Sequence, residues 1–449
     1  MAAAPGARWY NAVWRWHFYA GMLCMPFVLW LAATGTIFLW KPQIEAALDR
    51  PYDRLAVIGA RASAAAQVAA ALVAVPGATL RKYQLPQGPH EATRIILAKD
   101  GHDLRVYVNP YSRAVLATVR EDRRPLYVVQ QLHGTLLAGD LGSYIVEIAA
   151  CWTVTMLLTG LYLWWPRGRR GLAGVLYPRL RAGRRLFWRD LHAVAGIWVA
   201  GCALFLIATG LPWAKFWGNY FKDLRVATGT LDGPLDWTIG GKPAGDHAEH
   251  LGMGGAGAAV PAGPEIDRVV AVAYRLGAAP PVMLAPPAAP GKAWTLTSDA
   301  ANGPLRTTIT IDGATGRPVS QRDFAEHHWI DRAIGYGIAV HEGALFGLAN
   351  QLLGTLTALL LMTLSVSGAV MWWRRRPQGL LGAPIPLRRP RMGAVLIAAI
   401  LLLALWMPLF GATLLAVLAT ERLILRRLPA TARWLGLRHL PLDAPGAAP

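Results

Sequence analysis

The chain has 449 residues, of which 54% are hydrophobic and only 16% charged, and its formal net charge is +19. Soluble globular domains carry about a quarter charged residues, so the composition excludes an ordinary soluble protein. The positive charge does not indicate a nucleic-acid binder either, because the arginines gather in short loops between apolar segments rather than on one soluble face.

Four apolar runs are long enough to cross a bilayer, which takes roughly 20 residues. They cover residues 16–40, 143–165, 191–213 and 346–373. The first run is longer than the apolar core of a cleaved signal peptide and is followed by no small-residue cleavage site. We therefore expect residues 1–40 to form the first transmembrane helix. A fifth apolar tract, 392–420, contains Pro408 and Gly411 and predicts either a single span or a hairpin of two short helices.

Two short loops set the predicted orientation. Eight Arg and no acidic residue lie between Pro166 and Arg189, and six Arg and no acidic residue lie between Arg374 and Met392. Short Arg-rich loops stay in the cytoplasm. The N-terminus and the loop 167–190 should then be cytoplasmic. The region 377–449 should comprise a cytoplasmic loop, a C-terminal hydrophobic hairpin and a basic tail. We favour the hairpin for the last tract, because it keeps the arginines that follow it on the cytoplasmic side.

A repeat organises the chain into two copies. WRWHFYAG…ATG starts at Trp14 and WRDLHAVAG…ATG starts at Trp188, and in both a His precedes a Thr-Gly pair by 17 residues. LHGTLLAG…LTGLYLWWPR and VHEGALFG…VSGAVMWWRR match as well: His133 and His341 each lie 27 residues before a Gly and 31 before a Trp. Both copies run in the same direction, which predicts a parallel repeat about an axis along the membrane normal. We therefore predict an α-helical polytopic membrane protein with a four-helix core, followed by a C-terminal helical hairpin.

The two inserts between the spans, 41–127 and 214–330, are predicted to be small α+β domains on the periplasmic side. The first has an alanine-rich helical stretch at 63–75 and strands near 80–85, 93–98 and 104–119. The second has a helix at 265–276 and strands near 293–297 and 305–311. Asn-Pro and Asp-Gly hairpin signals close both inserts, in YVNPYSRAVL and ITIDGATGRPV.

An interfacial segment should follow each insert and open the regions 128–166 and 331–376. A straight helix from His133 to Trp165 would be about 49 Å long, which exceeds the thickness of the bilayer. We therefore expect a break at residues 139–142 and a similar one at 347–350.

Four of the eleven histidines occupy matched positions in the two copies: His17, His192, His133 and His341. Ionisable groups at membrane helices are costly and indicate function by default. The topology places the first two near the cytoplasmic face and the last two near the periplasmic face. Zinc takes about four ligands, usually with Cys or carboxylate among them, whereas two imidazoles on opposite sides of an iron porphyrin form a bis-His haem site. We therefore predict two haem b groups, with these four histidines as axial ligands of the haem iron.

Several other residues have a functional and a structural interpretation. His327 and His328 either line a substrate or haem edge or are ordinary interfacial residues. Arg15 and Arg189 either pair with haem propionates or anchor the chain in the interface. The paired tryptophans that end the second and fourth spans favour interface anchors over electron relays; they are Trp164, Trp165, Trp372 and Trp373. The three cysteines lie in apolar spans and are interpreted as small buried hydrophobic residues.

Nearly the whole chain resembles the PepSY-associated transmembrane helix family. The resemblance rests on WRWHFYAG…TG, LHGTLLAG…TGLYLWWPR and VHEGALFGLANQ…SGAVMWWRRRP, and the inserts look like PepSY domains. The family includes iron-regulated inner-membrane proteins of the PiuB kind and ferric-siderophore reductases of the FoxB kind. It implies a haem-containing membrane reductase that passes electrons from the cytoplasmic side to a ferric chelate in the periplasm.

Two functions from different classes follow. The first is a di-haem oxidoreductase of the bacterial inner membrane, which takes electrons from a separate quinol or cytoplasmic reductase and reduces a ferric-siderophore. The alternative is a non-enzymatic PepSY-domain binding or transport accessory protein for siderophore uptake, in which the four histidines are structural. A transporter working alone is disfavoured, because Glu147 is the one acidic residue in the first four spans.

Overall fold

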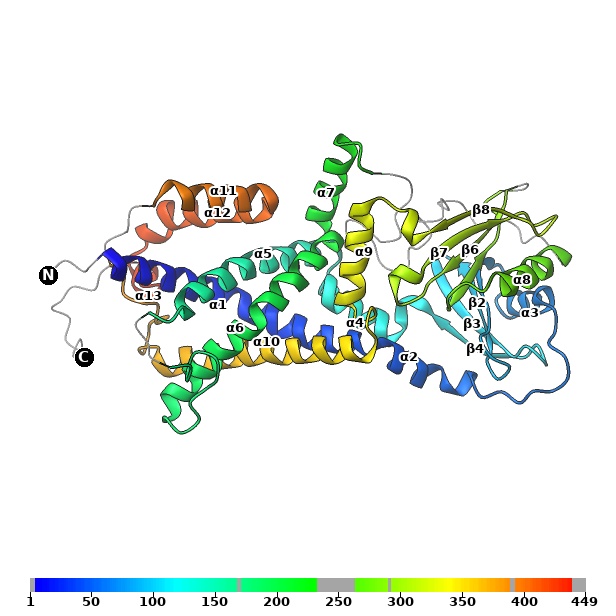
Figure 1. Ribbon diagram of the computed structural model, residues 1–449, viewed down its shortest axis with the longest axis horizontal. Helices are drawn as coiled ribbons and strands as arrows, with labels where there is room; N and C mark the ends of the chain where they lie inside the picture. Colours follow the sequence, from blue (N-terminus) through cyan, green and yellow to red (C-terminus); the bar gives the residue numbers. More distant parts are fainter. Residues whose placement is uncertain (1–4, 168–170, 232–262, 290–291, 388–391, 438–449) are drawn as a thin grey trace. The chain divides into compact units, whose positions relative to one another are not determined.

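The computed structural model describes residues 5–167, 171–231, 263–289, 292–387 and 392–437 (Figure 1). The chain divides into two units. The first, called here the membrane unit, comprises Met1–Thr36, His133–Tyr220 and Thr355–Pro449. The second, called the sheet unit, comprises Ile37–Leu132 and Phe221–Gly354.

Five helices of the described chain are long and apolar enough to cross a membrane. They are α1 (Pro5–Leu39), α5 (Gly139–Trp164), α6 (Arg184–Gly210), α10 (Leu348–Arg375) and α12 (Pro408–Leu423). In α6 and α12 the apolar stretch continues into a following 3₁₀ turn. The first four coincide with the four predicted spans, and together the five helices make the protein a multi-pass membrane protein.

The C-terminal apolar tract forms two helices rather than one. Helix α11 (Ala394–Trp406) ends and α12 begins around Met407 and Pro408, and the two helices lie side by side (Figure 1). Proline at the start of α12 fits this break, because the first turn of a helix needs no backbone N–H from it. At 13 residues α11 is shorter than the roughly 20 residues of a full span. A short helix, α13 (Pro429–Trp434), follows.

Short helices precede α5 and α10, as the length argument predicts. Helix α4 (Pro125–Gly134) ends in the region of His133, and α9 (Trp329–His341) ends at His341. Both breaks come earlier than the predicted 139–142 and 347–350, because α5 already begins at Gly139 and α10 at Leu348. Leu136 and Leu137 adopt left-handed backbone angles with φ of 51° and 58°, which a continuing α-helix of L-residues does not accommodate.

Two further helices lie at the boundaries of the inserts and were not predicted. Helix α2 (Lys41–Asp49) follows α1, and α7 (Lys215–Ala227) follows the 3₁₀ turn after α6. The aromatic residues of α7 lie on one face of the helix, and its lysines, aspartate and arginine lie on the other. Amphipathic helices of this kind are typical of a membrane interface.

The two inserts form one eight-stranded antiparallel sheet, with the order β4-β3-β2-β1-β5-β6-β7-β8. The first insert supplies β1 (Thr79–Gln84), β2 (Thr93–Lys99), β3 (His102–Val108) and β4 (Val115–Arg120). The second supplies β5 (Val282–Ala285), β6 (Trp294–Ser298), β7 (Thr307–Ile311) and β8 (Pro318–Asp323). The expectation of two separate small domains therefore needs correcting. Tyr83 of β1 pairs with Leu284 of β5, and Gln84 pairs with Met283. In two separate domains β1 and β5 would each be an exposed edge strand, whereas here they pair with one another.

Helices α3 (Ala64–Ala74) and α8 (Pro264–Leu276) cover one face of this sheet (Figure 1) and form the hydrophobic core with it. Successive side chains of a strand point to opposite faces. Along β2, Ile95 and Leu97 enter this core, whereas Arg94, Ile96 and Ala98 line a cavity on the opposite face. The sheet therefore has one apolar, covered face and one face with many polar side chains.

Candidate functional site

The structure brings His17 of α1 and His192 of α6 together within the membrane unit. Their ring centroids are 6.3 Å apart and their planes are inclined by 80°. Two imidazoles bound to one metal with metal–nitrogen bonds of about 2.0 Å have their centroids about 6 Å apart. The observed spacing matches this value, and it is also that of two rings in edge-to-face contact.

The contacts of His17 assign its tautomer. Its Nδ1 lies 3.0 Å from the carbonyl oxygen of Met156 and 3.2 Å from Oγ1 of Thr159. The Thr159 hydroxyl donates its own proton to the carbonyl of Thr155 at 2.7 Å, so it accepts from the imidazole. Nδ1 therefore carries the proton, and Nε2 keeps the lone pair that a metal needs.

His192 is held in the same way. Its Nδ1 lies 3.1 Å from the carbonyl oxygen of Leu364 and 3.2 Å from Oγ of Ser367. The Ser367 hydroxyl donates to the carbonyl of Thr363 at 2.6 Å, which again makes Nδ1 the donor and leaves Nε2 free. The two rings thus present equivalent nitrogens.

Glycines lie against the rings. A Cβ at Gly160 would be 3.1 Å from Cε1 of His17, and one at Gly368 would be 3.5 Å from Cε1 of His192. Each glycine follows the hydroxyl residue that accepts from the histidine. In the sequence the Thr-Gly pairs served only as markers of the repeat. The pattern of a Thr or Ser followed by Gly occurs once on each of the first four spans, at 34–35, 159–160, 209–210 and 367–368, and this recurrence was the signal that could have identified them.

His133 makes the same kind of contact in the membrane unit. Its Nδ1 lies 3.0 Å from Oγ1 of Thr34, whose hydroxyl donates to the carbonyl of Trp30 at 2.9 Å. A Cβ at Gly35 would lie 3.1 Å from Cε1 of His133. His341 belongs to the sheet unit, so the pairing of His133 with His341 stays a prediction from the sequence.

The donor set decides which kind of metal group would fit. Over the described ranges, no cluster of three or more His, Cys, Asp or Glu side chains could hold a metal ion. A bare zinc or iron site of about four protein ligands is therefore not built by these residues. Two histidines with free Nε2 atoms suit a group that brings its own equatorial ligands, such as an iron porphyrin.

The arginines considered as propionate partners have protein partners. Arg15 Nη2 donates to the carbonyl of Gly436 at 3.0 Å and contacts Tyr19 Oη at 3.1 Å. Arg189 Nη2 lies 2.8 Å from Oδ1 of Asp190. The Arg15 contact holds α1 to the segment that follows α13, whereas Arg189 pairs with the next residue of its own helix, α6.

The tryptophans at the ends of α5 and α10 also hold loops. Trp164 Nε1 donates to the carbonyl of Val175 at 3.0 Å, and Trp372 Nε1 donates to that of Leu381 at 2.8 Å. Trp165 and Trp373 are 65% and 63% exposed. These arrangements suit the interpretation as interface anchors.

Glu147, the acidic residue in the second span, caps a helix. Its Oε2 accepts from the backbone N–H groups of Phe216 and Trp217 at 3.1 and 3.2 Å, and Ser143 Oγ accepts from that of Lys215 at 3.0 Å. These are the first N–H groups of α7, which have no partner inside the helix. This carboxylate therefore has a structural role that does not require transport.

Within the sheet unit, a cavity of about 1150 Å³ opens on the sheet face opposite α3 and α8. Strands of both inserts form one wall, and α2, the start of α4 and residues 342–344 contribute to the others. We call this space the sheet cavity. It is the largest feature for which sequence reasoning gave no signal, because it depends on the pairing of the two inserts.

The part of the sheet cavity formed by the first insert is a network of paired charges. Arg94 contacts Asp53 at 2.7 Å and Asp49 at 3.2 Å. Asp49 Oδ1 also accepts from the hydroxyl of Tyr107 at 2.9 Å, and burial raises the pKa of Tyr107 to about 12. Burial also raises the pKa of Glu342, another residue that lines the cavity, above its ordinary value. Arg94, Asp49 and Asp53 are thus already paired with one another.

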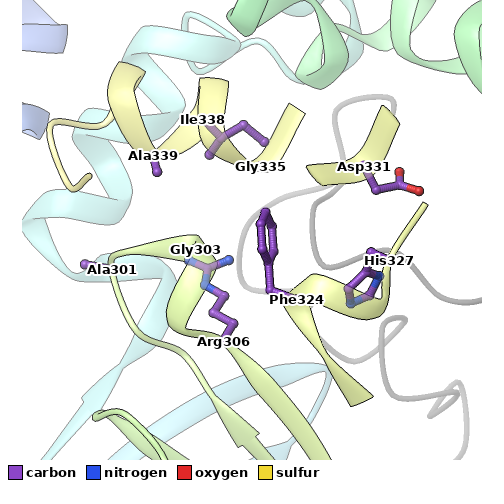
Figure 2. A pocket seen from close by; sticks show the side chains of 9 residues that line it. All are labelled: Ala301, Gly303, Arg306, Phe324, His327, Asp331, Gly335, Ile338 and Ala339. Carbon is purple, nitrogen blue, oxygen red and sulfur yellow. The ribbon is translucent and has the colours of Figure 1, made fainter. Parts of the chain in front are cut away.

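His327 and His328 have different surroundings. His328 Nδ1 accepts from the backbone N–H of Ile330 at 3.3 Å and caps α9. His327 is buried and lines a small pocket of about 30 Å³ together with Phe324 and Arg306 (Figure 2). That volume holds about one water molecule, so the small pocket admits neither haem nor chelate. His327 also lines the sheet cavity.

Asp331, shown beside His327 in Figure 2, serves another contact. It forms a buried ion pair with Arg225 of α7, with Nη2 and Oδ2 2.9 Å apart, and the Arg225 side chain is 2% exposed. The small pocket is thus part of the packing around this pair.

The fold and the paired histidines define a multi-pass membrane protein with a separate antiparallel sheet domain. The family model of the PepSY-associated TM region matches residues 14–375. The chain therefore belongs to that family, as its motifs predict. None of the curated proteins compared with the chain matches it.

Proposed function

We propose that the protein is an inner-membrane di-haem oxidoreductase that passes electrons from the cytoplasmic side to a periplasmic ferric-siderophore and so releases the iron. The observation that carries the proposal is the pair of rings of His17 and His192, 6.3 Å apart, with both Nδ1 atoms donating to carbonyls. Membership of the family, which suggests a protein of the PiuB or FoxB type, supports the same conclusion.

Haem iron would supply reversible one-electron transfer. His17 and His192 would hold the inner haem, and His133 and His341 the outer one. The carbonyl partners of Nδ1 fix each ring, and the hydrogen bond makes Nε2 more basic. A more basic ligand favours the ferric state, which lowers the reduction potential and makes the site a better electron donor.

One electron per iron leaves the protein and converts Fe(III) of the chelate to Fe(II). The hard oxygen ligands of a siderophore hold the less charged ion more weakly, so the iron is released. The electron would come from a separate quinol or cytoplasmic reductase. The membrane-spanning helices keep the two redox partners on opposite sides.

The test is the optical spectrum of the full-length protein, purified in detergent after expression with sufficient haem, first oxidised and then reduced with dithionite. We expect the sharp reduced bands of six-coordinate b-type haem and about two haems per chain. A featureless spectrum from folded protein would contradict the proposal.

The sheet cavity favours a second candidate function. On this hypothesis the protein is a non-enzymatic PepSY-domain binding or transport accessory for siderophore uptake. It predicts a colourless protein that binds a ferric chelate without changing the oxidation state of the iron. The spectrum and a ferrous-iron assay on the same sample distinguish the two functions.

A further inference from the structure

We propose that the sheet cavity binds the metal chelate that accepts the electron, and that it selects chelates of low net charge. The inference rests on the proposed function for the identity of the ligand. Its evidence is the size of the cavity, its position next to His341 and the charge of its walls.

The size of the cavity suits a chelate. Pockets for small molecules commonly measure about 300–1,000 Å³, and the sheet cavity measures about 1150 Å³. This exceeds what a single drug-sized molecule needs and fits a metal wrapped by a multidentate ligand, together with some bridging water.

The position of the cavity suits an electron acceptor. Glu342, Gly343 and Ala344 line it, and they directly follow His341 at the end of α9. Three residues span at most about 10 Å. A chelate in the cavity would therefore lie close to the chain segment that carries the proposed outer haem ligand.

The walls of the cavity carry charges of both signs. They include eight Lys or Arg residues and nine Asp or Glu residues. Several of the arginines are already neutralised by carboxylates, as Arg94 is by Asp49 and Asp53. A tri-anionic chelate would lose much of its hydration there and find no excess of positive charge in return. A neutral or singly charged chelate meets no such penalty.

The second insert supplies neutral hydrogen-bonding groups. Thr297 of β6, Thr308 of β7 and Ser320 of β8 line the cavity. They lie on adjacent strands, since Thr297 pairs with Thr308 and Ser320 follows on the neighbouring strand. Hydroxyl groups can donate to the oxygen atoms of a hydroxamate or a catecholate chelate, so the preference for the less charged trihydroxamate rests on the balance of charges in the walls.

The experiment measures binding without electron transfer. Gallium(III) has the charge of ferric iron and is not reduced under these conditions, so binding of its complexes is independent of haem. We would titrate the full-length protein in detergent by calorimetry with the Ga(III) complex of a linear trihydroxamate and, separately, with a Ga(III) tris-catecholate of charge −3. We expect saturable binding of the first and at least about tenfold weaker binding of the second.

Two tryptophan variants locate the site. Thr297→Trp fills the cavity and should weaken trihydroxamate binding at least about tenfold. Thr295→Trp is the matched control: Thr295 lies on the same strand and face but does not line the cavity. Ser320→Trp provides a second blocking variant if Thr297→Trp does not fold.

Equal binding by wild type and both blocking variants would overturn the inference. Tris-catecholate binding as tight as that of the trihydroxamate would overturn the charge selection. If the protein binds the gallium complex in the cavity but holds no haem, the site stands and the proposed reductase fails. If it reduces ferric chelates but the blocking variants have no effect, the reductase stands and the inference fails.

Discussion

The first histidines of the two sequence copies are held alike at the ring and differently just before it. His17 and His192 both donate from Nδ1 to a backbone carbonyl and to a hydroxyl, with a glycine beside the ring. Two residues earlier the copies differ in sign. Arg15 donates to backbone carbonyls, whereas Asp190 accepts from Arg179 and Arg189. The shared part is the part that would touch a common group. The differing part fastens a different segment in each copy: Arg15 holds the segment after α13, and Asp190 holds the loop that carries Arg179.

The largest expected effect comes from removing the shared part. His17→Ala and His192→Ala should each reduce the haem content from about two per chain to about one, since one axial ligand and its fixed ring are lost. Pyridine haemochrome quantification on purified protein measures this. His90→Ala is the control, because the His90 side chain is exposed, belongs to the sheet unit and has its Nδ1 2.8 Å from the carbonyl oxygen of Leu55. Full haem content in both variants would show that the pair is not a haem site.

The differing part should affect stability more than haem content. The Asp190 side chain is 0% exposed and meets two guanidinium groups, so Asp190→Asn should cost about 2 kcal/mol. Arg15→Gln removes hydrogen bonds to neutral carbonyls, so the free energy of unfolding should fall by only about 1 kcal/mol. Thermal unfolding in detergent ranks the two.

Limited trypsin digestion shows which loop each variant loosens. Asp190→Asn should expose cleavage at Arg179, whereas Arg15→Gln should expose sites in the loop after α10. Asp122→Asn, at an exposed ion pair with Arg120, should change neither pattern. Faster cleavage of both loops in both variants would mean that the two supports are not specific to their own copies.

The glycines sharpen the comparison at the ring itself. A Cβ at Gly160 would lie 3.1 Å from the His17 ring, against 3.5 Å for Gly368 and His192. The first distance requires the ring to move, and the second is an ordinary contact. Gly160→Ala should therefore broaden or shift the low-spin spectrum, while Gly368→Ala should leave it nearly unchanged. An equal effect of the two would indicate that the rings adjust freely.

Much of the sheet unit was predictable because its signals are local. The helix predicted at 63–75 begins after Ser63, whose Oγ accepts from the N–H of Ala66. The helix predicted at 265–276 ends before Gly277, which has a φ of 64°. Caps of this kind can be read directly from the residue type.

The parts that were missed depend on contacts distant in sequence. Strand β5 has only four residues, and its pairing with β1 decides that the inserts share one sheet. Strand β8 has an exposed, polar sequence without alternation. The sheet cavity follows from that pairing, so no sequence motif could predict it. In the membrane unit the spacing of the histidines singled them out, and the recurring Thr-Gly and Ser-Gly pairs marked the hydroxyl groups. Which hydroxyl group faces which histidine depends on the packing of α1, α5, α6 and α10.

The smallest expected effect comes from those hydroxyl groups. Thr159→Val and Ser367→Ala each remove one acceptor from a histidine Nδ1, while the carbonyl acceptors at 3.0 and 3.1 Å remain. The loss should make Nε2 slightly less basic and raise the midpoint potential of the inner haem by less than about 60 mV, the one-electron equivalent of about 1.4 kcal/mol.

Spectroelectrochemical titration of the full chain measures the shift. Thr363→Val on α10 is the control for Ser367→Ala, because the Thr363 hydroxyl donates to the carbonyl of Leu359 and not to a histidine. A downward shift would show that the hydroxyl donates to Nδ1 rather than accepting from it. The tautomer assigned to both rings, with Nε2 free for iron, would then be wrong, even if the ring spacing still admitted a haem.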